Sequence, residues 1–214
     1  MMEQWLISHE TVVIGVSFYG MLALVAVWES FSPAKPPTTS TPIRWLNNFA
    51  LLALDNLFIR LVFPLLAVSL SFAAAKHGWG LLNLVSLPMW LMLPVSLIIL
   101  DFSAYVVHRL LHEVPWLWRL HKIHHADLDY DVTTALRFHP LEAPVTLGTK
   151  LVVVALLGIP PVAVITYEAL FMGTAFINHG NVHLPKKLDY LLRPFIVTPD
   201  MHRIHHSIDL RESN

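Results

Sequence analysis

Long apolar segments constrain the fold of this chain more than any other feature. Residues 11–31 form a mostly apolar run, TVVIGVSFYGMLALVAVWESF, and about twenty such residues let an α-helix cross a hydrocarbon core roughly 30 Å thick. Further apolar stretches occupy about residues 45–75, whose more polar first half is expected at the membrane interface, and 81–107. The pattern predicts an all-α, multi-pass integral membrane helical bundle of about four membrane helices or hairpin segments.

Residues 143–177 are also apolar, but they do not have the pattern of a single crossing. Lys150 leaves only about nine apolar residues before the break at residues 158–161, Gly-Ile-Pro-Pro, and this is too few to span a bilayer alone. We therefore expect a re-entrant or kinked hairpin at about residues 143–177. A hairpin also returns the chain to the side it left, which brings the histidine-rich segments before and after it together.

The composition indicates a single membrane-embedded domain, residues 1–214, and excludes several functions. Hydrophobic residues make up 55% of the chain and charged residues 14%, and the mean hydropathy is +0.58, outside the usual range of a soluble domain. A net charge of −1 gives no general attraction for nucleic acid, so no nucleic acid partner is expected. Because there is no cysteine, disulfides and thiolate metal sites are excluded, and any metal is held by nitrogen or oxygen.

The basic residues predict the orientation in the membrane. Lys35 and Arg44 lie between the first two apolar stretches, and further basic residues lie in the histidine-rich part. Short cytoplasmic loops carry an excess of Lys and Arg, so we expect the histidine clusters on the cytoplasmic side. The first apolar run lacks a basic leader and is expected to be a retained span rather than a cleaved signal peptide.

Ten of the 13 histidines fall into four short motifs: HRLLH, HKIHH, HGNVH and HRIHH. Histidines three or four residues apart on a helix share a face, so each motif offers several imidazoles to one region. A single histidine is usually only a hydrogen-bonded core or surface residue, but four such motifs in order are hard to explain that way. Ten imidazoles exceed the needs of one metal, since zinc takes four ligands, and this predicts two metals close together.

The ligand type narrows the choice of metal. Imidazole suits zinc, copper, iron and nickel, and disfavours magnesium and calcium. A nitrogen-rich dimetal site beside a membrane fits oxygen activation at iron, and zinc remains an alternative or substitute. Hydrolytic dizinc sites usually include bridging carboxylates, and none lies inside the four motifs. A set of nearby polar residues is expected to orient the imidazoles from behind; these are Asp101, Asp127, Asn178 and Asp200, with Glu142 a weaker candidate.

The motifs resemble those of the fatty acid hydroxylase / sterol desaturase superfamily of integral-membrane, histidine-rich di-iron oxygenases. The resemblance rests on DFSAYVVHRLLH, PWLWRLHKIHHAD, TALRFHPLE, NHGNVH and TPDMHRIHHS, in that order, and it covers roughly residues 90–210. It implies a helical membrane bundle with a cytoplasmic histidine-rich dimetal cap over a catalytic region at 101–210. It implies ten metal ligands, namely His108, His112, His121, His124, His125, His179, His183, His202, His205 and His206. Members usually continue past the last motif with segments such as NYG and WD-x-x-F, whereas this sequence ends at RESN.

The resemblance also implies a function. The expected activity is hydroxylation or desaturation of a fatty acyl or sterol-like lipid by O₂, two iron ions and externally supplied electrons. The chain has no G-x-G-x-x-G dinucleotide motif, so an external electron donor (a reductase, ferredoxin or cytochrome) is expected as a partner. Two alternatives remain at this point: a membrane protein that binds or transports metal, and a dizinc hydrolase.

Overall fold

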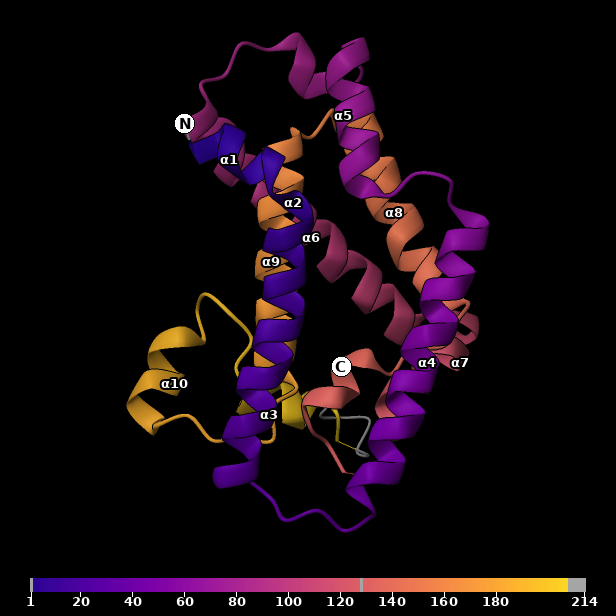
Figure 1. The fold of residues 1–214 in the computed structure, drawn as a ribbon, viewed down its shortest axis with the longest axis vertical. Coiled ribbons are helices and arrows are strands. Elements are labelled where there is room, and N and C mark those ends of the chain that lie inside the picture. Colours follow the sequence, from indigo (N-terminus) through magenta and orange to yellow (C-terminus); the bar gives the residue numbers. More distant parts are fainter. Residues whose placement is uncertain (1, 128, 208–214) are drawn as a thin grey trace.

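The computed structural model describes residues 2–127 and 129–207, and all regular elements in these ranges are helical (Figure 1). Residues 208–210, at the end of the predicted catalytic region, lie outside the described part. The α-helices are α1 Met2–Ser8, α2 Glu10–Gly15, α3 Met21–Phe31, α4 Thr41–Val62, α5 Ala67–His77, α6 Met89–Glu113, α7 Pro115–His121, α8 Glu142–Leu157, α9 Pro161–Asn178, α10 Lys186–Leu192 and α11 Pro199–His205. A π-helical turn joins α2 to α3, and short 3-10 turns lie at Leu81–Leu84, His124–Ala126 and Val132–Leu136.

Four helical stretches of the described part are long and apolar enough to cross a membrane. They are Glu10–Phe31, Thr41–Leu84, Met89–Glu113 and Pro161–Asn178. Their large apolar side chains often face outward, as Leu61 and Trp90 do, and an outward apolar surface is stable against lipid rather than water. The all-helical architecture with about four membrane helices, predicted from the apolar segments, is therefore confirmed.

Prolines set the helix ends in the middle of the chain. The stretch expected at 45–75 is divided into α4 and α5 at Pro64, and Phe63 before it is extended, because proline cannot donate a helical hydrogen bond and disfavours helical geometry in the preceding residue. Similarly, α6 begins at Met89, after Pro88, and not at Leu81. The 19 residues from Met89 to His108 rise about 29 Å at 1.5 Å per residue, so His108 lies close to the edge of the hydrocarbon layer.

Helices α8 and α9 run in opposite directions and are joined by a tight turn. Gly158 has a φ of 67°, and a Cβ atom there would lie 2.3 Å from the Trp79 carbonyl oxygen, so only glycine fits. The turn packs on α5 and α6 through a buried cluster that includes Leu100, Val154 and Ile159. The pair begins and ends at the same end of the molecule, where α7 also lies (Figure 1), and α11 packs against α9.

The proline-rich segment between α3 and α4 is not helical and is fastened to the histidine-rich end. The Asp129 carboxylate accepts hydrogen bonds from the backbone nitrogens of Thr38 at 3.0 Å and Thr39 at 2.6 Å. On α3, one Glu29 oxygen accepts from the backbone nitrogens of Val132 at 2.8 Å and Asn181 at 2.5 Å. These bonds join segments 90 or more residues apart and fix the loops that carry the histidines.

Candidate metal centre

Eight of the ten predicted ligands gather into two groups of four. The first histidine group is His108, His112, His121 and His205, and the second is His124, His179, His202 and His206. Within each group the four ligand atoms lie within 4.8 Å of one another. Two such groups match the two-metal expectation, and neither contains a carboxylate in the described part of the chain.

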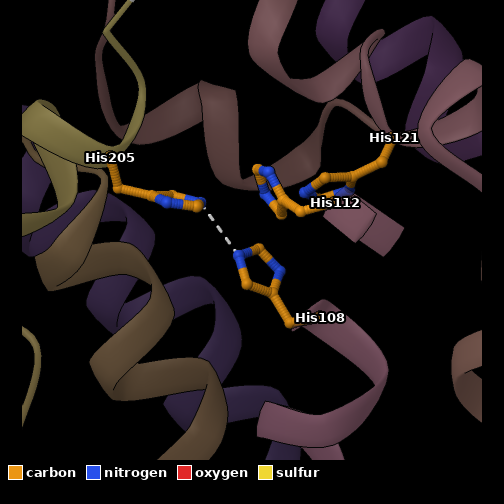
Figure 2. Close-up of side chains that lie close together, drawn as sticks. All are labelled: His108, His112, His121 and His205. Atoms are coloured by element: carbon orange, nitrogen blue, oxygen red, sulfur yellow. Dashed lines mark hydrogen bonds between the residues drawn. The ribbon is translucent and has the colours of Figure 1, made fainter. Parts of the chain in front are cut away.

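The first histidine group combines three helices. His108 and His112 lie one turn apart on α6, whereas His121 and His205 are the last residues of α7 and α11. Figure 2 shows the four imidazoles converging on one region, with His108 Nε2 and His205 Nε2 2.9 Å apart. The Nε2 atoms of His112 and His121 are buried and have no hydrogen-bond partner among the described residues. Convergent, unpaired ring nitrogens in a buried site fit a bound metal ion.

A carboxylate holds His121 from behind. His121 Nδ1 lies 2.8 Å from Glu142 Oε1, and both side chains are only 1% exposed. With Nδ1–H donated to the carboxylate, the lone pair of His121 Nε2 faces the group. Glu142 is thus the main orienting residue of the first group, although the sequence marked it only as a weaker candidate. Its signal was the position at the start of an apolar helix, directly after the segment RFHPL.

Backbone carbonyls orient the second histidine group instead. His124 Nδ1 lies 3.2 Å from the Arg137 carbonyl oxygen, and His179 Nδ1 lies 2.7 Å from that of Ala175. Their Nε2 atoms face each other at 3.1 Å, and His179 Nε2 also lies 3.0 Å from His202 Nε2. The imidazoles of this group therefore also direct Nε2 inward.

The two HxxHH motifs each divide between the groups, which the sequence did not predict. A single helical face had been expected for each motif. In the second motif, α7 ends at His121 and a 3-10 turn carries His124, so the helix stops between the two ligands. In the fourth motif, adjacent His205 and His206 point about 100° apart on α11 and enter different groups. Each motif thereby links the two groups.

His125 and His183 lie outside both groups. The ring of His125 stacks on that of His206, with centroids 4.2 Å apart, and lies 4.7 Å from that of His112, which places it between the groups. His183 has a side chain that is 62% exposed, and its Nδ1 lies 2.9 Å from Asp200 Oδ1. The ligand roles of these two residues stay predictions.

Burial keeps the imidazoles of the second histidine group in the neutral form. It lowers the pKa of His179 to about 4. Burial, together with the neighbouring histidines, also lowers the pKa of His124 and His202 well below the usual value, and lowers that of His206 in the same way. Neutral imidazole is the form that binds metal, so these residues are in the ligand form at physiological pH.

The four polar residues expected to orient the histidines have different contacts in the structure. Asp200 contacts His183. Asp127 accepts from Arg44 Nε at 2.8 Å and from Asn48 at 3.1 Å, and so belongs to a network behind the second group. In the amide orientation that satisfies both carbonyls, Asn178 donates to Thr174 and Val197. Asp101 lines a pocket between α6 and α9.

The network around Asp127 connects α4 to the second histidine group. Asn48 is fully buried; it donates to Thr133 Oγ1 at 2.9 Å and accepts from Arg137 Nη1 at 2.9 Å. The carbonyl of Arg137 in turn faces His124. Sequence reasoning missed Asn48 and Arg44 because their partners lie about 80 to 90 positions away in the chain.

Comparisons with known proteins agree with this geometry. The family model described as "Fatty acid hydroxylase" matches residues 93–214. The chain is 26% identical to ornithine lipid hydroxylase OlsE of Rhizobium tropici over 93% of its length, and 27% identical to alkylglycerol monooxygenase of Homo sapiens over 87%. It is 56% identical over 42% of its length to fatty acid hydroxylase vlmA of Lecanicillium sp.

The chain spans only part of each of these relatives. It covers 61% of the Rhizobium tropici protein, 39% of the human protein and 23% of the Lecanicillium protein. No solved structure matches the chain significantly. The family match extends from the second turn of α6 to the end of the sequence and includes all ten histidines of the four motifs.

Proposed function

Because the chain belongs to the fatty acid hydroxylase family, we propose that it is a membrane-bound di-iron oxygenase that hydroxylates or desaturates a lipid. The substrate is a fatty acyl or sterol-like lipid taken from the bilayer, the oxidant is O₂, and the electrons come from a separate reductase, ferredoxin or cytochrome. The observation that carries this proposal is the pair of four-histidine groups with converging, buried ring nitrogens.

The residues present fit two metal ions. The first histidine group would hold one ion and the second histidine group the other. When bound, iron supplies O₂ activation and the oxidising power needed to break a strong C–H bond. Glu142 fixes the tautomer of His121, and backbone carbonyls do the same for His124 and His179. The burial of these groups limits the access of water, and the membrane helices below them give an apolar lipid a route from the bilayer.

The groups also bear on the two alternatives. A dizinc hydrolase usually bridges its metals with carboxylates, and neither group contains one in the described part of the chain. A transporter would line a path through the membrane with ligands, whereas these histidines gather into two compact groups.

The decisive experiment uses the full chain in lipid nanodiscs. Metal analysis should find about two iron ions per chain, and extracted lipids incubated with O₂ and a reducing system should gain one oxygen atom or lose two hydrogen atoms by mass spectrometry. His124→Ala should abolish product formation and lower the amount of bound metal. His77→Ala should change neither, because His77 lies outside both groups. Two zinc ions with no O₂ consumption in the presence of reductant and lipid would overturn the proposal.

We further propose that the histidine groups face the cytoplasm. Lys35 and Arg44 lie at the same end as the histidines, since Lys35 N bonds to Asn181 Oδ1 at 3.0 Å and Arg44 contacts Asp127. Basic loops are retained on the cytoplasmic side. The chain has no cysteine, so a single Lys122→Cys variant can be labelled with a membrane-impermeant maleimide. Labelling should occur only after the cells are opened. Labelling of intact cells would show that the histidine groups face the outside instead.

A further inference from the structure

A pocket of about 510 Å³ lies between α6 and α9, away from the histidine ligands. One wall is a stripe of α6 with Ile98, Asp101 and Tyr105, and the other is a stripe of α9 with Tyr167 and Thr174. Both walls belong to helices that are long and apolar enough to cross a membrane. The pocket is therefore open to a lipid moving within the bilayer.

Both walls lead to the histidine groups. Asp101 precedes His108 by seven residues on α6, a rise of about 10 Å along the helix. Thr174 precedes His179 by five residues, a rise of about 7 Å. The pocket thus approaches the first histidine group along one helix and the second along the other. A ligand held in it would extend toward both.

Asp101 is the uncompensated charge of this pocket. The nearby Lys150 is paired with Glu168 at 2.8 Å, and Arg109 is paired with Glu113 at 2.6 Å. Asp101 forms no ion pair with Lys or Arg in the ranges that the structure describes. An ionisable residue in a membrane helix is costly unless a partner neutralises it, so the pocket favours a cationic ligand.

Tyr167 provides a second polar group that lacks a partner. It is only 4% exposed, it lines the same pocket, and its hydroxyl has no hydrogen-bond partner among the described residues. Buried hydroxyls are usually hydrogen-bonded. A ligand ammonium could donate one hydrogen bond to the Asp101 carboxylate and another to the Tyr167 oxygen, which would satisfy both groups.

We propose that the α6–α9 pocket binds an amphipathic lipid through a primary ammonium group, with Asp101 as its counter-ion and Tyr167 as its second hydrogen-bond acceptor. This inference rests on the proposed function, because the bound lipid is the substrate. The ammonium group is held about 10 Å from His108, which selects lipids that carry an amine at that distance from the carbon attacked. Asp101 and Tyr167 are thus specificity-determining residues.

The test measures binding rather than turnover, so it does not depend on the chemistry at the metals. Metal-loaded protein in phosphatidylcholine nanodiscs is titrated with dodecylamine, dodecanol and dodecanoate, and binding is followed by native mass spectrometry. Dodecylamine should bind at least about tenfold tighter than dodecanol, as expected for a charge-assisted hydrogen bond, and dodecanoate should bind most weakly. Asp101→Asn should remove the preference for the amine, and Tyr167→Phe should reduce it about threefold.

Glu113→Gln is the matched control, because it removes an exposed carboxylate from the same helix outside the pocket and should keep the amine preference. Equal binding of amine and alcohol by the unaltered protein, or an unchanged preference in Asp101→Asn, would overturn the inference. If Asp101→Asn fails to fold, Asp101→Glu should retain the preference and Tyr167→Phe should still weaken it. Selective amine binding without any lipid oxidation would leave this site intact and refute the oxygenase instead.

Discussion

The two histidine groups hold their imidazoles from behind by different means. In the first, a buried carboxylate, Glu142, contacts His121. In the second, neutral backbone carbonyls contact His124 and His179. A carboxylate both orients an imidazole and makes it a more basic ligand, whereas a carbonyl mainly orients it. The difference teaches that two sites with the same number of histidines need not bind their metals equally, and we expect the first group to bind more tightly.

Removal of one ligand should show whether the groups are separate sites. His205→Ala alters the first group and His124→Ala the second, and each variant should fall from about two metal ions per chain to about one. Metal analysis of purified protein measures this, with His77→Ala as the control. Loss of both ions from either variant would mean that the groups load as one unit, and full loading of both variants would refute the ligand assignment.

Neutralising Glu142 should reduce the expected difference in metal affinity between the two histidine groups. Glu142→Gln keeps a carbonyl oxygen near His121 but removes the charge, so the first group should lose about 10- to 100-fold in metal affinity. Competition with a chelator measures this affinity. Glu113→Gln is the control, because Glu113 is a half-exposed carboxylate that lies outside both groups. An equal loss in the two variants would show that Glu142 has no special role.

Lowering the pH should destabilise the metal-free protein, because the second histidine group is buried in the neutral form. Burial lowers the pKa of His179 to about 4, whereas the unfolded chain takes up that proton near pH 6.5. The unfolding free energy of the metal-free protein should therefore be independent of this protonation above about pH 6.5. It should decrease as the pH falls from about 6.5 toward about 4, because only the unfolded chain binds the proton there. Thermal unfolding followed by circular dichroism should show the falling midpoint. His179→Asn should make the profile less steep, and a midpoint independent of pH in the unaltered protein would contradict the expectation.

Disrupting the hydrogen-bond network behind the second histidine group should have a smaller effect on stability and metal affinity. Asn48→Ala removes the side chain that joins Arg137 to Thr133, which should cost about 1–3 kcal/mol of unfolding free energy and weaken metal binding severalfold at the second group only. The exposed neighbour Asn47 provides the matched control, Asn47→Ala. A similar loss of metal affinity at the first group would mean that the network supports the whole histidine-rich end rather than one group.

The membrane helices could be predicted from the sequence, because length and hydropathy alone decide whether a helix can span a bilayer. Prolines explain where the long stretches break in the structure: Pro64 divides α4 from α5, and Pro88 precedes the start of α6. The exact helix ends were harder to predict from the sequence. A short non-helical segment such as residues 85–88 has the same apolar composition as the helices around it.

The site was only partly predictable. The motifs identified the histidines, but their division into two groups depends on where α7 ends and how α11 is rotated, and a spacing rule within one helix cannot give either. Asp127 was expected behind the histidines because it follows His125, and its carboxylate bonds Arg44 and Asn48, whose positions in the chain gave no sign of this contact. Glu142 lies 21 positions from His121. Neighbours in the sequence were poor guides to neighbours in space.

The position of α11 has a consequence for the life of the protein in the cell. Each histidine group includes ligands from α11, residues Pro199–His205 and the His206 that follows, and the ribosome makes this helix after all the others described here. Until it is made, both histidine groups lack members: His205 from the first, and His202 and His206 from the second. If both groups hold metal as proposed, complete metal loading would therefore follow the synthesis of α11.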